Sequence, residues 1–422
     1  MATRRQFSGL LAGCIAAALG PRGAHGATAP YREGPTMFSR VIADIQGWDR
    51  ITDHRTGTAG DAHTARWLAD AVRAAGVEPL VQSFPFRRRV PQDCRVRADG
   101  QWAEGVPLFD GGYTDAAGLR GRIGALGSDA PIGLARFSPF AGHPENQRLE
   151  RARREGAHKA IVAVALGEPV KPGLALLNAD DWREPFGPPV LQVATEEGAW
   201  LDELANAGGE VELTAYVTFE DTEASNVEAR IEGSRKDLAP LVIMTPRSAW
   251  WICTSERGGG ITVWLECLRR FADEQPERTV LFTANTGHEL GHVGLERYLE
   301  EHQALIAGAR AWLHLGANFA ARGGRVRYQA SDAALLELGL GAIERSAGLS
   351  VERKELDVTP VQSRPYGEAR NIYDGGGQYV SLLGDNPLFH HPDDRWPEAV
   401  DVERTAALTE AMLDVASTLA RA

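Results

Sequence analysis

The chain has 422 residues, of which 43% are hydrophobic and 24% are charged, and its formal net charge at pH 7 is −12. This is the composition of a globular protein, and the length predicts two or three domains. The charge is negative and no basic stripe stands out, so no nucleic-acid partner is expected.

The first 26 residues resemble an export signal. A pair of arginines precedes a moderately apolar run over residues 7–19, and small residues lie near a cleavage point expected after Gly26. The order Thr-Arg-Arg-x-Phe resembles a twin-arginine signal, which predicts a periplasmic or secreted protein. Lipid anchoring at Cys14 is the less favoured alternative, because the apolar run continues past it. No later segment has about 18 continuous apolar residues, so no transmembrane segment is expected in the mature chain.

The cysteines beyond this signal are Cys94, Cys253 and Cys267. An odd number cannot form a full disulfide framework, so the fold is expected to depend on its hydrophobic core. The sequence leaves open whether two of them form one bridge.

The remaining chain divides into three blocks. In the first, about residues 36–90, helical spacing of apolar residues predicts a helix ended by Gly76 and then a strand over 77–86. The second, about residues 95–220, has short apolar runs between Gly/Pro turns and an alternating strand over 211–219. It predicts a β-rich inserted domain, with 27–94 and 221–422 forming the other domain.

The third block alternates strands and helices. The predicted elements are, in chain order, a strand over 238–246, a helix over 259–274, strands over 278–287, 311–319 and 377–384, and a closing helix over 402–421. This order predicts an α/β fold, a mostly parallel mixed sheet with helices on both faces. Sites in such sheets lie at the C-terminal ends of the strands.

Chemically useful side chains follow the predicted strands. The segments are TPRSAWWICTSERGGG (245–260), NTGHELGH (285–292) and GDNPLFHHPDDRWPEAVD (384–401). Six of the ten histidines beyond the signal lie at or after His288. A single histidine is more often structural than a ligand, but several at converging strand ends favour a site.

The segment HELGH at 288–292 matches the HExxH signature, in which two histidines one helical turn apart bind zinc and the glutamate is the general base. A strand-like run and an Asn-Thr-Gly turn immediately precede His288, however. Gly291 and Gly294 each disfavour a helix interior by about 1 kcal/mol relative to alanine. A zincin helix is therefore the less favoured interpretation, and a strand-to-helix junction is expected.

With these segments in place, the sequence resembles the M-twenty-eight family of zinc exopeptidases, which includes bacterial leucyl aminopeptidases and glutaminyl cyclases. Residues 54–86 resemble the leading helix and strand of the family, and residues 95–220 its protease-associated insert. VLFTANTGHELGHVGLERYL (280–299) resembles the strand with a Gly-Glu-Glu-Leu-Gly-type turn, and NPLFHHPDDRWPEAVD (386–401) resembles the closing Tyr-His-Thr-Pro-x-Asp segment. The resemblance implies a zinc exopeptidase-like fold and a peptide or small amide substrate.

The resemblance also implies a two-zinc site, from which this sequence departs. The family's ligand positions that are lost fall on Pro246, Ser248 and Gly316. The retained positions fall on Glu256, Glu289 and His390. Three protein ligands with one open position suit a catalytic zinc, so a single zinc ion is expected.

The general-base position of the family falls on His288, whose imidazole is expected to move protons near neutral pH. Further candidates are auxiliary: His314 lies two residues before Gly316 on the same strand face, and Asp394 is expected to orient an imidazole. The other auxiliary candidates are His292, for which a packing role is favoured, and Arg257. The aromatic wall of a substrate pocket is expected from Trp250 and Trp251.

Three functions remain open from the sequence. The preferred one is an exported, aminopeptidase-like hydrolase of peptide or amide bonds with a single zinc. The first alternative is a catalytically inactive binding or scaffold protein on a peptidase fold, because several of the family's catalytic positions are lost. The second is acyl transfer of the glutaminyl cyclase type, because those members keep one zinc.

Overall fold

A computed structural model describes residues 35–349, 356–361 and 363–421, and Thr36–Ala422 form one compact unit. The predicted export signal and Cys14 lie outside the described residues. None of the described helices is long and apolar enough to cross a membrane.

The described residues form a sheet of 13 strands in the order β1-β2-β6-β5-β4-β3-β7-β9-β8-β10-β13-β11-β12. The strands are β1 (Pro79–Ala98), β2 (Gln101–Pro107), β3 (Leu119–Ala125), β4 (Ile132–Phe137), β5 (Ala160–Ala165), β6 (Val190–Val193), β7 (Glu210–Ile231), β8 (Leu241–Pro246), β9 (Val280–Asn285), β10 (Ala311–Leu315), β11 (Val326–Ala330), β12 (Leu356–Val358) and β13 (Tyr379–Gly384). The helices are α1 (Met37–Asp49), α2 (Ala59–Ala74), α3 (Pro144–Glu155), α4 (Gly198–Ala207), α5 (Thr254–Asp273), α6 (Val293–Glu301), α7 (Gln303–Gly308), α8 (Ala333–Ala347), α9 (Ala369–Asp374) and α10 (Val402–Leu419), with short 3-10 turns η1 (Thr195–Glu197) and η2 (His288–Leu290).

Four neighbouring strands, β9, β8, β10 and β13, run parallel, and the antiparallel strands β7 and β11 flank them. This confirms the predicted α/β class with a mostly parallel mixed sheet. Because parallel strands point their carboxyl ends to one edge, the segments after β8, β9 and β13 meet there.

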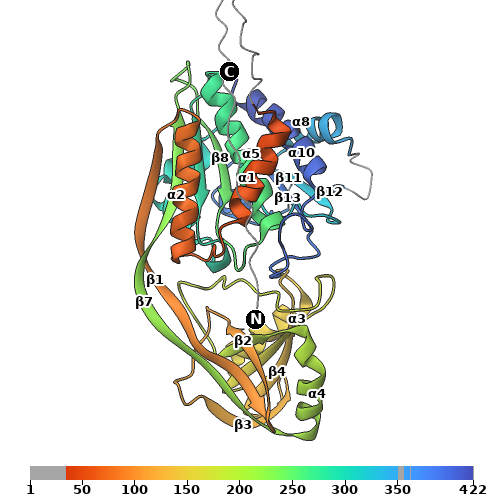
Figure 1. Cartoon of the computed structure of the whole chain (residues 1–422). Coiled ribbons are helices and arrows are strands. Elements are labelled where there is room, and N and C mark those ends of the chain that lie inside the picture. Colours follow the sequence, from red (N-terminus) through yellow and green to blue (C-terminus); the bar gives the residue numbers. More distant parts are fainter. Residues whose placement is uncertain (1–34, 350–355, 362, 422) are drawn as a thin grey trace, which may run out of the picture. The chain divides into compact units, whose positions relative to one another are not determined.

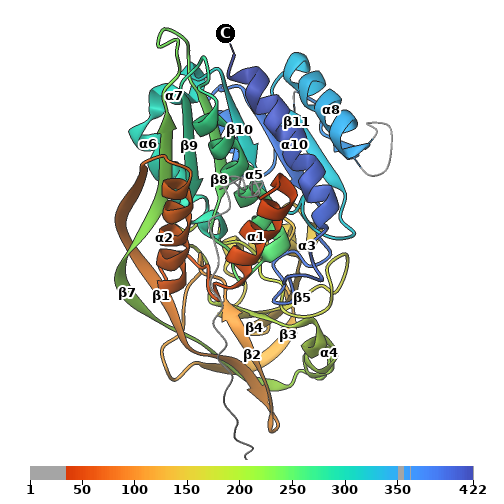
Figure 2. The same ribbon diagram turned by 45° about the horizontal axis from the view of Figure 1, so that its top comes forward.

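Both faces of this sheet are buried, as the uninterrupted apolar sequence of β8 predicts. Leu241 and Ile243 belong to a core that includes residues of α2, α5, α8 and α10. Val242 and Met244 belong to a separate core that includes residues of α6, α7 and α9. Alternate residues of a strand point to opposite faces, so one strand supplies both cores. Figures 1 and 2 show α1, α2, α5 and α10 together on one side of the sheet.

The β-rich part of the chain is built on the ends of β1 and β7, which pair from Pro79↔Ala229 to Arg97↔Glu212 (Figure 1). Strands β2, β6, β5, β4 and β3 continue from β1 back to β7, so the pairings form a closed ring. Strands β2, β3, β4, β5 and β6 therefore each have a strand partner on both sides, which leaves these five without a free edge that could template aggregation. The domain limits at residues 95 and 220 stay a prediction. Strand β1 runs continuously through residue 95, and strand β7 runs continuously through residue 220.

Several element boundaries differ from those predicted, most of all the ends of β1 and β7, which were predicted at residues 86 and 219, and the start of α5. Strand β1 continues to Ala98 because its long partner β7 supplies hydrogen bonds along its whole length. Helix α5 begins at Thr254, five residues before the predicted start, because the Asp394 carboxylate accepts hydrogen bonds from the backbone N–H groups of Ser255 (2.8 Å) and Glu256 (3.1 Å). A cap from so far along the chain leaves no signal in the local sequence. Cys94, Cys253 and Cys267 are free thiols.

Candidate active site

The HELGH segment forms a turn and not an α-helix. Residues His288–Leu290 are a single 3-10 turn between Gly287 (φ 82°) and Gly291 (φ 70°), and His292 also has a positive φ of 63°. Helix α6 begins only at Val293. The expected strand-to-helix junction is therefore confirmed, and the regular helix that places the two histidines of an HExxH zinc protease is absent from these described residues.

Among the described residues, three groups of side chains bring candidate metal-ligand atoms within 4.8 Å of one another. The groups are Glu256, His288 and His390; His288, His292 and Glu368; and Cys253, Glu256 and Asp394, all buried. Glu256 lies in the first turn of α5 after β8, His288 follows β9, and His390 follows β13. The first group therefore assembles where the carboxyl ends of three parallel strands meet.

Glu256 and His390 are buried polar groups with unfilled bonding capacity. Neither the carboxylate oxygens of Glu256 nor the Nε2 atom of His390 forms a hydrogen bond with the described residues. Their closest atoms, Glu256 Oε1 and His390 Nε2, are 3.4 Å apart. His390 Nδ1 lies 2.6 Å from the backbone carbonyl of Leu176, so Nδ1 donates a proton and Nε2 is left as the electron-pair donor.

A buried guanidinium adjoins this carboxylate. Arg257 Nη2 is 2.7 Å from Glu256 Oε1, and Arg257 Nε donates to the backbone carbonyl of Ser248 at 2.7 Å. Burial acts to raise the pKa of Glu256, but the positive charge of the adjoining Arg257 outweighs it and holds this pKa below its ordinary value. Glu256 is therefore an anion at neutral pH.

His288 is held by a residue that the sequence did not point to. Glu368, at the start of α9, accepts from His288 Nδ1 at 2.6 Å and from His314 Nε2 at 3.1 Å. Burial acts to raise the pKa of Glu368, but His288 and the hydrogen bonds from His288 and His314 hold it well below its ordinary value. Glu368 follows no strand and belongs to no recognised motif. Its one signal is an acidic residue beside a glycine at the start of a short helix, which is too common to identify a site.

Glu289 lies in none of the three groups found among the described residues. Its Oε1 accepts hydrogen bonds from the Thr56 backbone N–H (2.9 Å) and the Thr56 hydroxyl (2.8 Å). Its Oε2 accepts from the Ser248 hydroxyl at 2.6 Å. Ser248 in turn accepts from the backbone N–H groups of Gly287 and His288, so Glu289 fixes the turn that carries His288.

The auxiliary candidates also lie around this centre. His314 Nδ1 lies 2.8 Å from the hydroxyl of Ser381, so its two nitrogens bridge Ser381 and Glu368. Asp394 caps α5 and thereby holds Glu256 in place. The ring of His292 stacks on that of His288 with centroids 5.2 Å apart, and burial lowers the pKa of His292 to about 4.

A pocket of about 660 Å³ opens beside the two stacked histidines. His288 and His292 line it, together with residues that follow β10 and β13 and residues of the β-rich part such as Phe140 and Asn178. Backbone hydrogen bonds connect the two parts here, because Ala179 N donates to the carbonyl of Glu289 at 2.9 Å. The β-rich part therefore forms one wall of the cleft.

The two tryptophans predicted to form the aromatic wall of a substrate pocket are not among the residues that line this cleft. Trp250 is 2% exposed, and its Nε1 donates to Asn178 Oδ1 at 2.9 Å. Trp250 lines a second, smaller pocket, and Trp251 is partly buried against the same apolar cluster.

No protein-family model and no curated protein matches the sequence. The structure is similar to that of a zinc aminopeptidase from Bacillus subtilis, with a TM-score of 0.73, 16% identity, and coverage of 92% of this chain and 97% of that chain. It is also similar to a peptidase M28 precursor from Shewanella amazonensis SB2B (TM-score 0.70, 14% identity, 92% and 97% covered). An aminopeptidase from Aneurinibacillus sp. strain AM-1 gives a TM-score of 0.66 at 14% identity, with 91% and 94% covered. The chain therefore has the fold of these aminopeptidases.

Proposed function

We propose that the protein is a zinc-dependent hydrolase of peptide or small amide bonds, of the aminopeptidase type, with one zinc ion held by Glu256, His288 and His390. The observation that supports the proposal is the buried pair Glu256 and His390: Glu256 Oε2 and His390 Nε2 form no hydrogen bond among the described residues, and Glu256 Oε1 has only the ion pair with Arg257 beside its 3.4 Å approach to His390. Buried polar atoms without partners are rare in folded proteins and indicate a missing ion or ligand.

The chemistry of these three side chains suits zinc. Two imidazoles and one carboxylate are a ligand set of catalytic zinc sites, which keep a further position open. In this proposal His288 replaces Glu289 as the third ligand, because both Glu289 oxygens already accept short hydrogen bonds from Thr56 and Ser248. A bound zinc would polarise a substrate carbonyl and lower the pKa of a water molecule.

The surrounding residues keep these side chains in position. Glu368 accepts the Nδ1 proton of His288, and the Leu176 carbonyl accepts that of His390, so each ring has one nitrogen left to bind a ligand. His292 is neutral at pH 7, since burial lowers its pKa to about 4. Its Nδ1 lies 2.9 Å from Asn371 Oδ1 and donates to it, so its other ring nitrogen can accept a hydrogen bond from a water molecule or substrate in the cleft.

One observation favours a second candidate, a catalytically inactive binding protein on the same fold. The Arg257 guanidinium already lies 2.7 Å from Glu256 and neutralises it without a metal. In that case the cleft beside His288 and His292 would bind a peptide or amide without hydrolysing it.

The experiment is a hydrolysis assay on the purified protein with a panel of aminoacyl and glutaminyl anilides, before and after removal of metal by a chelator. The proposal predicts hydrolysis that the chelator abolishes, that zinc restores, and that Glu256→Gln removes. Glu274→Gln, an exposed change just beyond the end of the same helix, is the matched control and keeps activity. Hydrolysis that is indifferent to the chelator, or no hydrolysis of any substrate by the zinc-loaded protein, contradicts the proposal.

A further inference from the structure

The cleft beside His288 and His292 is large enough for a short peptide. Its volume of about 660 Å³ lies within the range of roughly 300–1,000 Å³ that is usual for sites that bind small molecules. Its charged lining residues are three arginines and two aspartates, namely Arg325, Arg327, Arg370, Asp180 and Asp385. The pairing of these charges indicates which end of a peptide the cleft would bind.

Two of the three arginines already have close partners. Asp385 accepts from Arg325 at 3.0 Å with one carboxylate oxygen and from Arg327 at 3.3 Å with the other. Arg327 also pairs at 2.8 Å with Asp357, which does not line the cleft. Both arginines and Asp385 are therefore occupied, which leaves Arg370 as the cation to consider.

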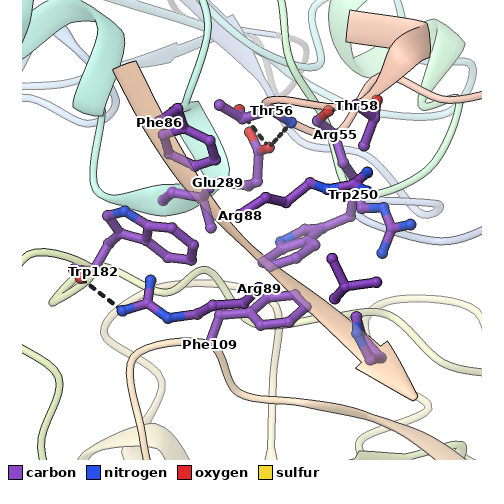
Figure 3. A pocket seen from close by; sticks show the side chains of 13 residues that line it. Arg55, Thr56, Thr58, Phe86, Arg88, Arg89, Phe109, Trp182, Trp250 and Glu289 are labelled. Atoms are coloured by element: carbon purple, nitrogen blue, oxygen red, sulfur yellow. Dashed lines mark hydrogen bonds between the residues drawn. The ribbon is translucent and has the colours of Figure 1, made fainter. Parts of the chain in front are cut away.

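Two buried glutamates near the cleft are occupied as well. Glu368 accepts from His288 Nδ1 and from His314 Nε2. Glu289 faces a different pocket, where its carboxylate accepts hydrogen bonds from Thr56 (Figure 3). Neither carboxylate is free to pair with the ammonium group at the amino end of a peptide.

Arg370 is the most loosely paired arginine of the cleft. Asp180 is the one acceptor of its guanidinium among the described residues, and the distance of 3.5 Å from Nη2 to Oδ1 is at the outer limit of a hydrogen bond. The Arg370 side chain is 25% exposed and that of Asp180 is 46% exposed. An ion pair this long and this exposed contributes little energy. The guanidinium is therefore available to an anion from outside the chain.

The position of Arg370 in the chain ties it to the candidate metal centre. It lies in the first turn of α9, between Glu368, which accepts from His288 Nδ1 at 2.6 Å, and Asn371, whose Oδ1 lies 2.9 Å from His292 Nδ1. Consecutive Cα atoms are about 3.8 Å apart, so the backbone of Arg370 is held close to both of these residues. Its side chain lines the cleft together with the two histidines. A cation therefore lies on the same cleft wall as the proposed zinc ligand His288.

We propose that the cleft binds dipeptides through their C-terminal carboxylate, with Arg370 as the residue that pairs with it, which makes dipeptides the substrate class of the proposed hydrolase. A planar guanidinium suits a carboxylate because its N–H groups match the carboxylate oxygens. Each further residue would move the carboxylate about 3.3–3.6 Å away from His288, so longer peptides fit less well. Cleavage rests on the proposed function: it consumes one water and yields two free amino acids. Binding of the carboxylate needs no zinc.

The test is a calorimetric titration of the chelator-treated protein with leucyl-leucine and, in parallel, with its amide, leucyl-leucinamide. The two ligands share the amino group and both side chains and differ in the carboxylate. The dipeptide is expected to bind with a dissociation constant of about 1 mM or lower, and the amide about tenfold more weakly, because a charged hydrogen bond is lost. The α-amide of leucyl-aspartate, whose only carboxylate is in the side chain, is expected to bind as weakly as leucyl-leucinamide.

Two variants in the cleft should change the affinity in opposite directions. Arg370→Gln is expected to weaken leucyl-leucine by about tenfold and to leave the amide unchanged. Asp180→Asn removes the competing carboxylate and is expected to strengthen leucyl-leucine by about two- to fivefold. Arg364→Gln is the matched control, because Arg364 is 56% exposed, pairs with Asp374 and does not line the cleft, and it leaves all affinities unchanged.

Cleavage is measured separately, on the zinc-loaded protein, where kcat/KM for leucyl-leucine is expected to exceed that for trileucine by about tenfold. Selective binding of the dipeptide without hydrolysis would support the carboxylate site and contradict the hydrolase proposal. If Arg370→Gln does not fold, the comparison of dipeptide and amide on the unaltered protein decides. Equal binding of dipeptide and amide, stronger binding of the leucyl-aspartate amide, weaker dipeptide binding in Asp180→Asn, or full dipeptide affinity in folded Arg370→Gln overturns the proposal.

Discussion

Replacement of Arg257 by methionine tests the electrostatics of the candidate metal centre. Arg257 and Glu256 are 2.7 Å apart, and both side chains are 0% exposed. Removing one partner of such a buried pair costs about 3–5 kcal/mol, because the other charge is left without compensation. That is a large part of a folding stability of about 5–15 kcal/mol. The zinc-free Arg257→Met protein should therefore unfold at a much lower urea concentration than the unaltered protein.

Zinc and pH should both change the difference in stability between Arg257→Met and the unaltered protein. In the variant, Glu256 has no competing guanidinium, so zinc should stabilise the variant more than the unaltered protein. Arg257 also helps to keep the pKa of Glu256 in the folded protein below its ordinary value. The ionised carboxylate therefore contributes stability at pH values above the pKa of Glu256 in the unfolded chain. This contribution is lost as the pH falls through the lower pKa of Glu256 in the folded protein. Without Arg257, burial raises the pKa of Glu256 in the folded variant. The difference in the free energy of unfolding between the two proteins should therefore be largest at pH 7–8 and should shrink toward pH 4.

The assay is urea unfolding of both proteins, metal-free and zinc-loaded, at several pH values. Arg270→Met is the matched control, because Arg270 is 45% exposed on the same helix and its loss should change stability by less than about 0.5 kcal/mol. A loss of less than about 1 kcal/mol in metal-free Arg257→Met at pH 7 would refute the reasoning, because the buried charge would then have been compensated by another group.

Three further changes test separate parts of the account. Glu289→Gln should keep its zinc but lose about 1–3 kcal/mol of stability, because an amide cannot accept from Ser248 as the carboxylate does. Glu368→Gln should lower amidase activity by about 10- to 100-fold and shift its pH profile, since it removes the charged acceptor of His288. His54 is buried, and burial lowers its pKa to about 3. Because this histidine takes up a proton more readily in the unfolded chain, its presence destabilises the folded protein increasingly as the pH falls below 6.5. His54→Phe should therefore lose less stability than the unaltered protein between pH 6.5 and pH 3.

Each of these expectations has a contrary outcome. Zinc loss in folded Glu289→Gln, seen by elemental analysis, would restore Glu289 as the third ligand. An unchanged pH profile for Glu368→Gln, with exposed Glu344→Gln as control, would show that Glu368 does not act on His288. Parallel acid-unfolding curves for the unaltered protein and His54→Phe would show that another group controls the acid transition.

The fold was predictable because its strands carry strong local signals. The apolar sequence of β8 indicates a strand buried on both faces, and the helical spacing that ends at Gly76 places α2. The start of α5 was not predictable, since its cap is supplied by Asp394, more than a hundred residues away. The exact path of β1 likewise depends on its pairing with β7.

The candidate site was predictable in place but not in detail. The sequence indicated Glu256, Glu289 and His390 as the metal ligands and His288 as the general base, and all four follow strands of the parallel sheet. It could not show that Glu289 turns toward Thr56 and Ser248, because adjacent residues of a tight turn point in different directions. Glu368 was missed because it approaches His288 through tertiary packing and belongs to no motif.

The central claim is that Glu256, His288 and His390 hold one zinc ion. Elemental analysis of the purified protein, dialysed after exposure to zinc, tests it most directly. The account predicts about one zinc per chain. It also predicts nearly none in Glu256→Gln or His390→Ala and full occupancy in Glu274→Gln. An unaltered, folded protein that retains no zinc, or a Glu256→Gln protein that retains all of it, would contradict the account.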